Sequence, residues 1–109
     1  MSNELEPEPE VGMGATLLYG MSSNEHRPAT VAEVVRFKTG ARKGEINKIA
    51  VRADHYWLTD DGSKPGWGSE EEPEAPVQWY RKDQRGKWRS PGGARVGIGY
   101  RSYSYDAHL

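Results

Sequence analysis

The chain of 109 residues is 35% hydrophobic and 28% charged, which predicts one folded domain around a single modest core. Its net charge of -1 argues against bulk attraction to nucleic acid or anionic membranes, and the absence of cysteine excludes disulfides, thiol nucleophiles and thiolate metal sites. No apolar run is long enough to span a bilayer and the acidic start is no signal peptide, so we expect a cytoplasmic protein.

The first ten residues alternate glutamate with proline, which predicts a disordered acidic tail because charge repulsion and proline both oppose burial. The folded domain is expected over residues 11–109. Its first strand is predicted over residues 15–19 and, after a polar loop that ends at Pro28, its second over residues 29–38. Four apolar residues of this second segment share one parity and are expected on one face: Ala29, Val31, Val35 and Phe37.

A turn rich in glycine and lysine leads to a third predicted strand over residues 46–54. Residues 55–59 continue that strand or form one of their own, whereas the glycines, prolines and glutamates that follow predict an irregular connection. Residues 77–83 and 86–90 flank a tight turn and predict a hairpin. An alternating segment over residues 95–106 is the last predicted strand.

These elements amount to about five to seven short strands, and no segment is typical of a long helix. The pattern predicts an all-β domain, either a small SH3-like barrel or a compact β-sandwich. Exposed strand edges could also pair two copies into a homo-oligomer.

The closing stretch VGIGYRSYSYD raises the question of a ligand surface. A strand sends alternate side chains to opposite faces, which assigns one set to the core: Val96, Ile98 and Tyr100. The other set combines bare backbone with cationic and aromatic side chains: Gly97, Gly99, Arg101, Tyr103 and Tyr105. Such a face can stack a base or another planar ligand, although tyrosines can equally well cover the open end of a barrel.

Two other clusters carry charge. His26 and Arg27 lie at the expected loop tip before Pro28, where they can hold a phosphate or carboxylate; local capping of the backbone is the alternative. A secondary basic and aromatic patch surrounds the hairpin and suits nucleic acid, or is merely its solvated face: Trp79, Arg81, Arg85, Lys87 and Trp88.

Catalysis is not expected from these residues. The three histidines lack metal-ligand spacing, and no serine lies in a Gly-x-Ser-x-Gly elbow. The glycines of residues 92–99 precede no helix, so they form no dinucleotide or P-loop cradle. We therefore expect a protein that is no enzyme and that uses neither a metal nor a cofactor.

Five segments carry a resemblance and keep their order along the chain: GATLLYG, HRPATVAEV, KIAVRADHY, YRKDQRGKWR and VGIGYRSYSYD. They resemble a family of small proteins encoded in bacteriophage and prophage genomes. The chain departs from that family's pattern in a longer turn over residues 38–46, in the hairpin turn at residues 84–86, and in its last three residues.

The resemblance implies an accessory protein that acts inside an infected bacterium. The residues that match the family's motif by position are His26, Arg27, Thr30, Arg101, Tyr105 and Asp106.

Together these observations favour a non-enzymatic barrel that binds an anionic planar ligand. A nucleotide or a short single strand of nucleic acid would satisfy both stacking and charge, and sequestering a host signalling nucleotide is one version. This hypothesis requires the chain near Arg27 and near Arg101 to converge. The alternative is an interaction module that binds a host bacterial protein, with tyrosines and tryptophans as anchors.

Overall fold

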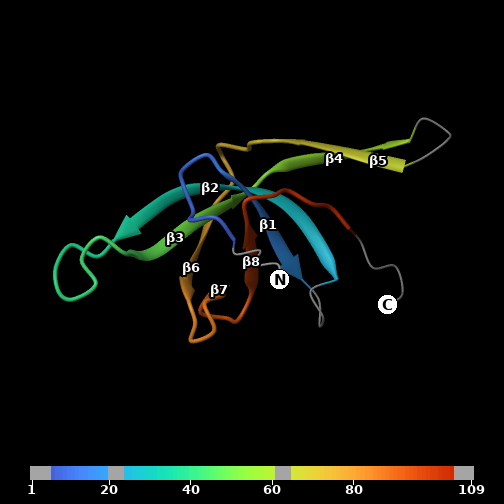
Figure 1. Ribbon diagram of the computed structural model, residues 1–109. Helices are drawn as coiled ribbons and strands as arrows, with labels where there is room; N and C mark the ends of the chain where they lie inside the picture. Colours follow the sequence, from blue (N-terminus) through green and yellow to red (C-terminus); the bar gives the residue numbers. More distant parts are fainter. Residues whose placement is uncertain (1–5, 20–23, 61–64, 105–109) are drawn as a thin grey trace.

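The computed structural model describes residues 6–19, 24–60 and 65–104. Figure 1 shows these residues as strands and loops without a helix, so the described part of the chain holds no helix long and apolar enough to cross a membrane. The strands are β1 (Gly14–Tyr19), β2 (Glu25–Arg36), β3 (Ile46–Ala53), β4 (His55–Asp60), β5 (Pro65–Glu70), β6 (Val77–Lys82), β7 (Trp88–Arg89) and β8 (Arg95–Ile98).

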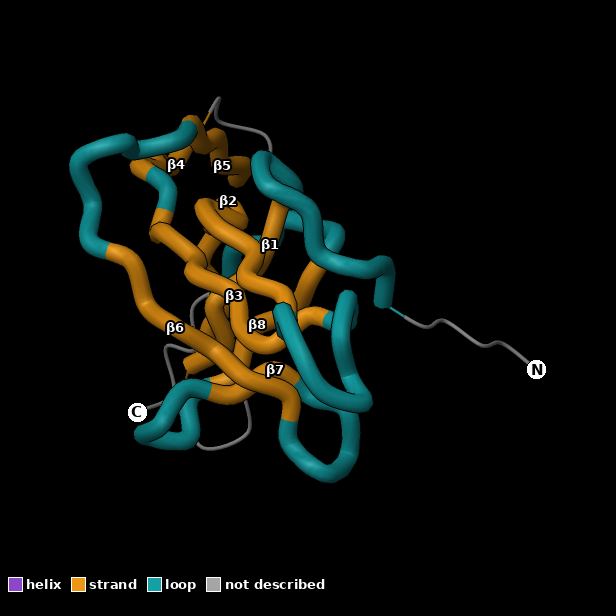
Figure 2. Tube along the Cα trace, turned by 90° about the vertical axis from the view of Figure 1, so that its left-hand side faces the viewer, coloured by secondary structure: helices purple, strands orange, loops and turns teal. Residues whose placement is uncertain are grey.

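Six of these strands close into an antiparallel barrel in the order β1-β2-β3-β6-β7-β8, because β8 pairs back onto β1. The prediction of a small all-β barrel is therefore confirmed, and a single closed sheet takes the place of the sandwich alternative. Figure 2 shows the barrel strands with the separate β4–β5 pair above them. Alternate side chains fill the interior: Ala15, Leu17, Ala29, Val31, Ile49, Val51, Tyr80, Trp88, Val96 and Ile98.

The long strand β2 begins earlier than predicted and contains the segment expected to be a loop tip. Leu18 pairs with His26 and Leu17 with Arg27, so both candidate ligand residues lie inside the sheet. Pro28 is tolerated because its nitrogen faces the edge of β2 beyond Ala29, the first β2 residue that pairs with β3. The Pro28 carbonyl accepts the Asp54 N–H at 3.0 Å. The loop interpretation is wrong for this reason.

A register shift between Val31 and Glu33 changes which side of β2 faces the core. Val34 packs against the core in place of Val35, so the predicted shared face of Ala29, Val31, Val35 and Phe37 is wrong beyond Val31. An extra residue in one strand of a pair reverses the alternation that follows it, and sequence parity does not reveal this.

The acidic segment before β1, expected to be solvated, packs on the barrel from residue 6 onward. Pro9 is buried, Pro7 lies against Gly99, and a Glu6 carboxylate oxygen accepts the Ile98 N–H at 3.2 Å. Glu8 pairs with Arg36 at 3.2 Å. The Ile98 N–H and the Arg36 guanidinium thus hold Glu6 and Glu8 on the barrel, although the composition of this segment is typical of disorder.

The connection predicted to be irregular contains β5, which pairs with β4 in a two-stranded ribbon outside the barrel. Figure 1 shows this β4–β5 ribbon projecting on one side and the β2–β3 hairpin on the other, which agrees with overall dimensions of 56 × 32 × 30 Å. A Cβ at Gly68 would lie 2.7 Å from the Trp57 ring. The glycine is therefore needed because the indole covers its backbone.

The last strand ends at Ile98, much earlier than predicted. Gly99 adopts a φ of 99°, a conformation that turns the chain out of the sheet. Tyr100 consequently leaves the alternation: it is 45% exposed, and its ring covers Gly97 from outside. The placement of Tyr100 in the core is wrong, and tyrosine and proline rings of the chain itself cover the glycines expected to approach a ligand.

Candidate functional site

Residues 99–104, which we call the strap, cross the outer face of β1 and β2 after β8 ends (Figure 1). The buried Thr16 hydroxyl donates a 2.8 Å hydrogen bond to the Tyr100 carbonyl. At the far edge of β2, Ser104 and His26 exchange two backbone hydrogen bonds of 3.0 Å. The strap thus extends the sheet beside β2 where β3 has already ended.

Arg101, Asp54 and Thr30 form a hydrogen-bonded triad, the clasp, beneath the strap. Arg101 Nε donates to Asp54 Oδ2 at 2.9 Å, and Arg101 Nη2 donates to Thr30 Oγ1 at 2.8 Å. The Thr30 hydroxyl in turn donates to Asp54 Oδ1 at 2.7 Å. The Asp54 side chain is 1% exposed and that of Arg101 is 33% exposed.

The geometry of the clasp explains why Arg101 lies where it does. Its side chain packs directly over Gly14, where a Cβ would come within 3.0 Å of the guanidinium. A carboxylate buried as deeply as that of Asp54 requires a charged partner, and Arg101 supplies it. The charge of Arg101 therefore holds the strap on the barrel.

Rings from β4, β5 and the strap form a cluster, here called the aromatic cluster: Tyr56, Trp67 and Tyr103. Arg27 packs against its two tyrosines. The Arg27 Cζ atom lies 5.0 Å from the Tyr103 ring centroid and 5.7 Å from that of Tyr56. The Tyr103 centroid is 5.1 Å from Tyr56 and 6.5 Å from Trp67. Tyr103 therefore connects the ribbon to the strap.

Main-chain and acidic groups also engage Arg27 and His26. Arg27 Nη1 donates to the Ser104 carbonyl at 2.9 Å, and Glu25 lies 3.5 Å from Arg27 Nη2. His26 Nδ1 is 3.0 Å from the Ser102 hydroxyl. These bonds join neighbouring parts of β2 and the strap.

The strap contains or contacts five of the predicted ligand residues: His26, Arg27, Thr30, Arg101 and Tyr103. Alternation places Arg27 on the same side of β2 as the core residues Ala29 and Val31, and His26 and Thr30 on the other side. Tyr105 and Asp106 lie outside the described residues. The strap contacts both arginine regions, but Arg101 bonds Asp54 and Thr30 whereas Arg27 contacts Ser104, Tyr56 and Tyr103. The convergence of Arg27 and Arg101 into one site stays a prediction. Ligand binding by this group of residues stays a prediction.

The sequence reasoning missed an exposed apolar surface on the ribbon. Trp57, Leu58 and Trp67 are 43%, 63% and 37% exposed. Alternation places Leu58 and Trp67, which pair across the strands, on one face and Trp57 on the other. The signal in the sequence was the pair of aromatic segments HYWLTD and PGWGSE on either side of a polar turn.

The residues of the predicted hairpin patch have different surroundings, and ligand binding by them stays a prediction. Trp88 is 2% exposed and belongs to the core. Trp79 lies on the outer face, where Lys48 Nζ is 4.7 Å from its ring, and Arg81 donates to Asn47 at 2.8 Å. Arg85 and Lys87 instead line a groove at the end of the barrel, described below.

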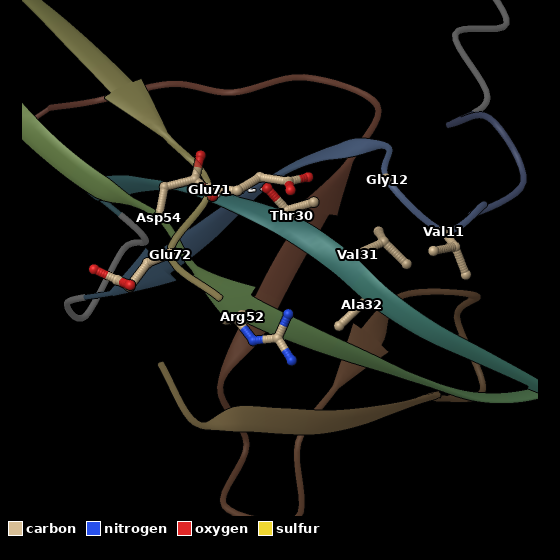
Figure 3. Close-up of a pocket in the computed structure, with 9 residues that line it drawn as sticks. All are labelled: Val11, Gly12, Thr30, Val31, Ala32, Arg52, Asp54, Glu71 and Glu72. Carbon is tan, nitrogen blue, oxygen red and sulfur yellow. Dashed lines mark hydrogen bonds between the residues drawn. The ribbon is translucent and has the colours of Figure 1, made fainter. Parts of the chain in front are cut away.

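A cavity of about 120 Å³ lies beside the clasp, between β2, β3 and the connection after β5 (Figure 3). Thr30, Arg52, Asp54, Glu71 and Glu72 contribute its polar groups. Ligand sites for drug-sized molecules measure roughly 300–1,000 Å³, so this cavity is too small for a nucleotide. The described residues also hold no cluster of side chains suited to a metal ion.

Comparison of the chain with protein-family models, with curated proteins and with solved structures found no match. What the protein does is therefore inferred from its own surfaces: the clasp, the aromatic cluster, the exposed ribbon and the groove at the end of the barrel.

Proposed function

We propose that this chain is a non-enzymatic interaction module whose β4–β5 ribbon docks into an apolar cleft of another protein. The observation that carries the proposal is the exposure of Trp57, Leu58 and Trp67 on a ribbon that stands outside the barrel. Tryptophan is enriched among the few residues that dominate binding energy, and clustered exposed apolar side chains mark interaction sites.

The support of the ribbon favours this proposal. A two-stranded ribbon is marginally stable alone in water, yet here it is fixed at its base. Tyr103 contacts Tyr56 and Trp67, and Arg27 packs against the two tyrosines. A ribbon held in position before binding loses less conformational entropy on association.

The charges near the ribbon define the chemistry of the partner. Four glutamates end or follow β5: Glu70, Glu71, Glu72 and Glu74. They repel the phosphates of nucleic acid and complement a basic rim. We therefore propose a protein partner with an apolar cleft and basic surroundings, and the resemblance to phage-encoded proteins favours a host protein in the bacterial cytoplasm.

The test compares capture of bacterial proteins by the wild-type chain and by the double variant Trp57→Ala/Leu58→Ala. A matched control is Tyr19→Ala, because Tyr19 is an exposed aromatic residue on β1, away from the ribbon. A specific partner should bind the wild type and the control. With the purified partner, the double variant should bind about 30-fold or more weakly, as expected for loss of hot-spot residues.

Two results would contradict the proposal. One is equal binding of the same partner by the double variant. The other is a wild-type dimer that Trp57→Ala/Leu58→Ala converts to a monomer in analytical ultracentrifugation, which would assign the ribbon to self-association.

A second candidate function is binding of an anionic planar ligand at the aromatic cluster. The specific observation in its favour is the guanidinium of Arg27 at 5.0 Å from the Tyr103 ring, beside the exposed Trp67. A thermal-shift panel of mono-, di- and cyclic nucleotides tests it. We expect a shift that Trp67→Ala abolishes and Tyr19→Ala preserves; a silent panel would reject this candidate.

A further inference from the structure

A groove of about 620 Å³ lies at the end of the barrel. Three segments form it: residues 6–9, the turn between β2 and β3, and the β6–β7 hairpin. Its volume falls within the range of roughly 300–1,000 Å³ that is typical of small-molecule sites. We call it the barrel-end groove.

The β6–β7 hairpin gives this groove a cationic wall. Lys82, Arg85 and Lys87 all line it, and all three are exposed. No ion pair within the described residues involves any of them. This wall therefore carries three positive charges, and no carboxylate of the described residues lies within ion-pair distance of them.

The one acidic residue of the hairpin does not neutralise that wall. Asp83 Oδ1 accepts the backbone N–H groups of Arg85 and Lys87 at 2.8 and 2.9 Å, and Oδ2 pairs with Arg89 at 2.7 Å. These bonds fix the backbone of the turn that carries the side chains of Arg85 and Lys87. The carboxylate of Asp83 is thus fully engaged within the turn.

The other acidic residues that line the groove also have partners. Glu8 pairs with Arg36, Glu45 pairs with Arg42 at 3.0 Å, and Glu6 accepts the Ile98 N–H. Pro7 and Ile46 add apolar surface to the lining. The groove therefore offers both cationic and apolar side chains, as a molecule with a flat ring and phosphates requires.

We propose that the barrel-end groove binds a nucleoside phosphate, with its phosphates on Lys82, Arg85 and Lys87 and its base against Pro7 and Ile46. The site shares no residue with the ribbon, so its failure would leave the docking proposal intact.

The experiment is a titration of the isotope-labelled full chain with ATP, followed by ¹H–¹⁵N correlation spectra, with tripolyphosphate as the second probe. We expect amide shifts concentrated in residues 82–88 and 42–46, and weaker binding of tripolyphosphate, which lacks the base. Equal affinity for tripolyphosphate would overturn the assignment of a nucleoside. Shifts confined to Tyr56, Trp67 and Tyr103 would overturn the location.

Matched charge variants sharpen the test. Arg85→Ala and Lys87→Ala should each weaken ATP binding about tenfold or more, because each removes a charge-assisted hydrogen bond to phosphate. The control is Arg81→Ala, which removes an equal charge from the same hairpin at a residue that bonds Asn47 instead of lining the groove. If all three variants weaken ATP binding equally, ATP is attracted by net charge alone and the proposal is overturned. The proposal is also overturned if the wild-type chain does not bind ATP.

Discussion

Two groups of cationic side chains differ in what surrounds them. Arg27 and Arg101, at the strap, are bonded to carboxylates, carbonyls or aromatic rings of the chain itself. Arg85 and Lys87, on the β6–β7 hairpin, are exposed, and no ion pair of the described residues includes them. Residues of one chemical type thus stabilise the fold in one region and leave charge available to a ligand in the other.

The difference shows how burial decides the role of an arginine. At the strap, the partner of Arg101 is a carboxylate with 1% exposure, so the ion pair is costly to break. On the hairpin, a cation in contact with water has little effect on stability, and its field extends into the groove. We therefore expect substitution of Arg101 to change stability and substitution of Arg85 to change ligand binding.

The largest expected effect separates the two groups directly. Arg101→Ala should lower the free energy of unfolding by about 3 kcal/mol, because it leaves the buried Asp54 carboxylate without a charged partner. Arg85→Ala should change it by less than about 0.5 kcal/mol, as is usual for exposed positions. Urea denaturation measures both variants, and a similar loss in the two would contradict the distinction.

A smaller effect is expected when the charge of Asp54 is removed with its shape kept. Asp54→Asn should cost about 1–2 kcal/mol, since the amide still accepts the Thr30 hydroxyl but loses the ion pair. Because Arg101 and Asp54 are in contact, the double variant Arg101→Ala/Asp54→Asn should lose less than the sum of the single variants. Strict additivity in the same urea experiments would argue against the clasp.

The smallest effect concerns acid and the hairpin turn. Hydrogen bonds from the Lys87 backbone and from Arg89 lower the pKa of Asp83 to about 2 from its usual 3.8. The stability that this carboxylate contributes is therefore present above pH 4 and is lost as the pH falls toward 2. Asp83→Asn should be less stable than the wild type above pH 4, and this difference in melting temperature should shrink as the pH falls toward 2. A difference that does not change with pH would contradict the role given to the Asp83 carboxylate.

Much of the barrel could be predicted from local pattern. The sequence predicted the first three strands of the barrel, and the turn at Asp83 identified the β6–β7 hairpin. The errors occurred where distant segments decide local structure. Gly99 ends β8 early, and the edge beyond β3 lets β2 continue through Pro28. Neither effect is visible in a window of neighbouring residues.

The candidate site was only partly predictable. The sequence singled out Arg101 and Thr30, which share a hydrogen bond, and His26 and Arg27, which bond other residues of the strap. It did not reveal Asp54, because the acid that bonds Arg101 lies 47 residues earlier and looks like an ordinary residue after a strand. A side chain's partner, and with it its role, becomes apparent only when the chain is folded.

The most direct measurement is hydrogen–deuterium exchange of the ribbon amides in Tyr103→Ala, with Tyr100→Ala as the matched control on the same strap. Tyr103 contacts Tyr56 and Trp67 on the ribbon, whereas the Tyr100 ring covers Gly97 in β8. If the strap supports the docking ribbon, Tyr103→Ala should speed exchange in β4 and β5 about tenfold or more relative to β1. Tyr100→Ala should leave that ratio unchanged. Unaltered ribbon exchange in Tyr103→Ala would contradict support of the ribbon by the strap.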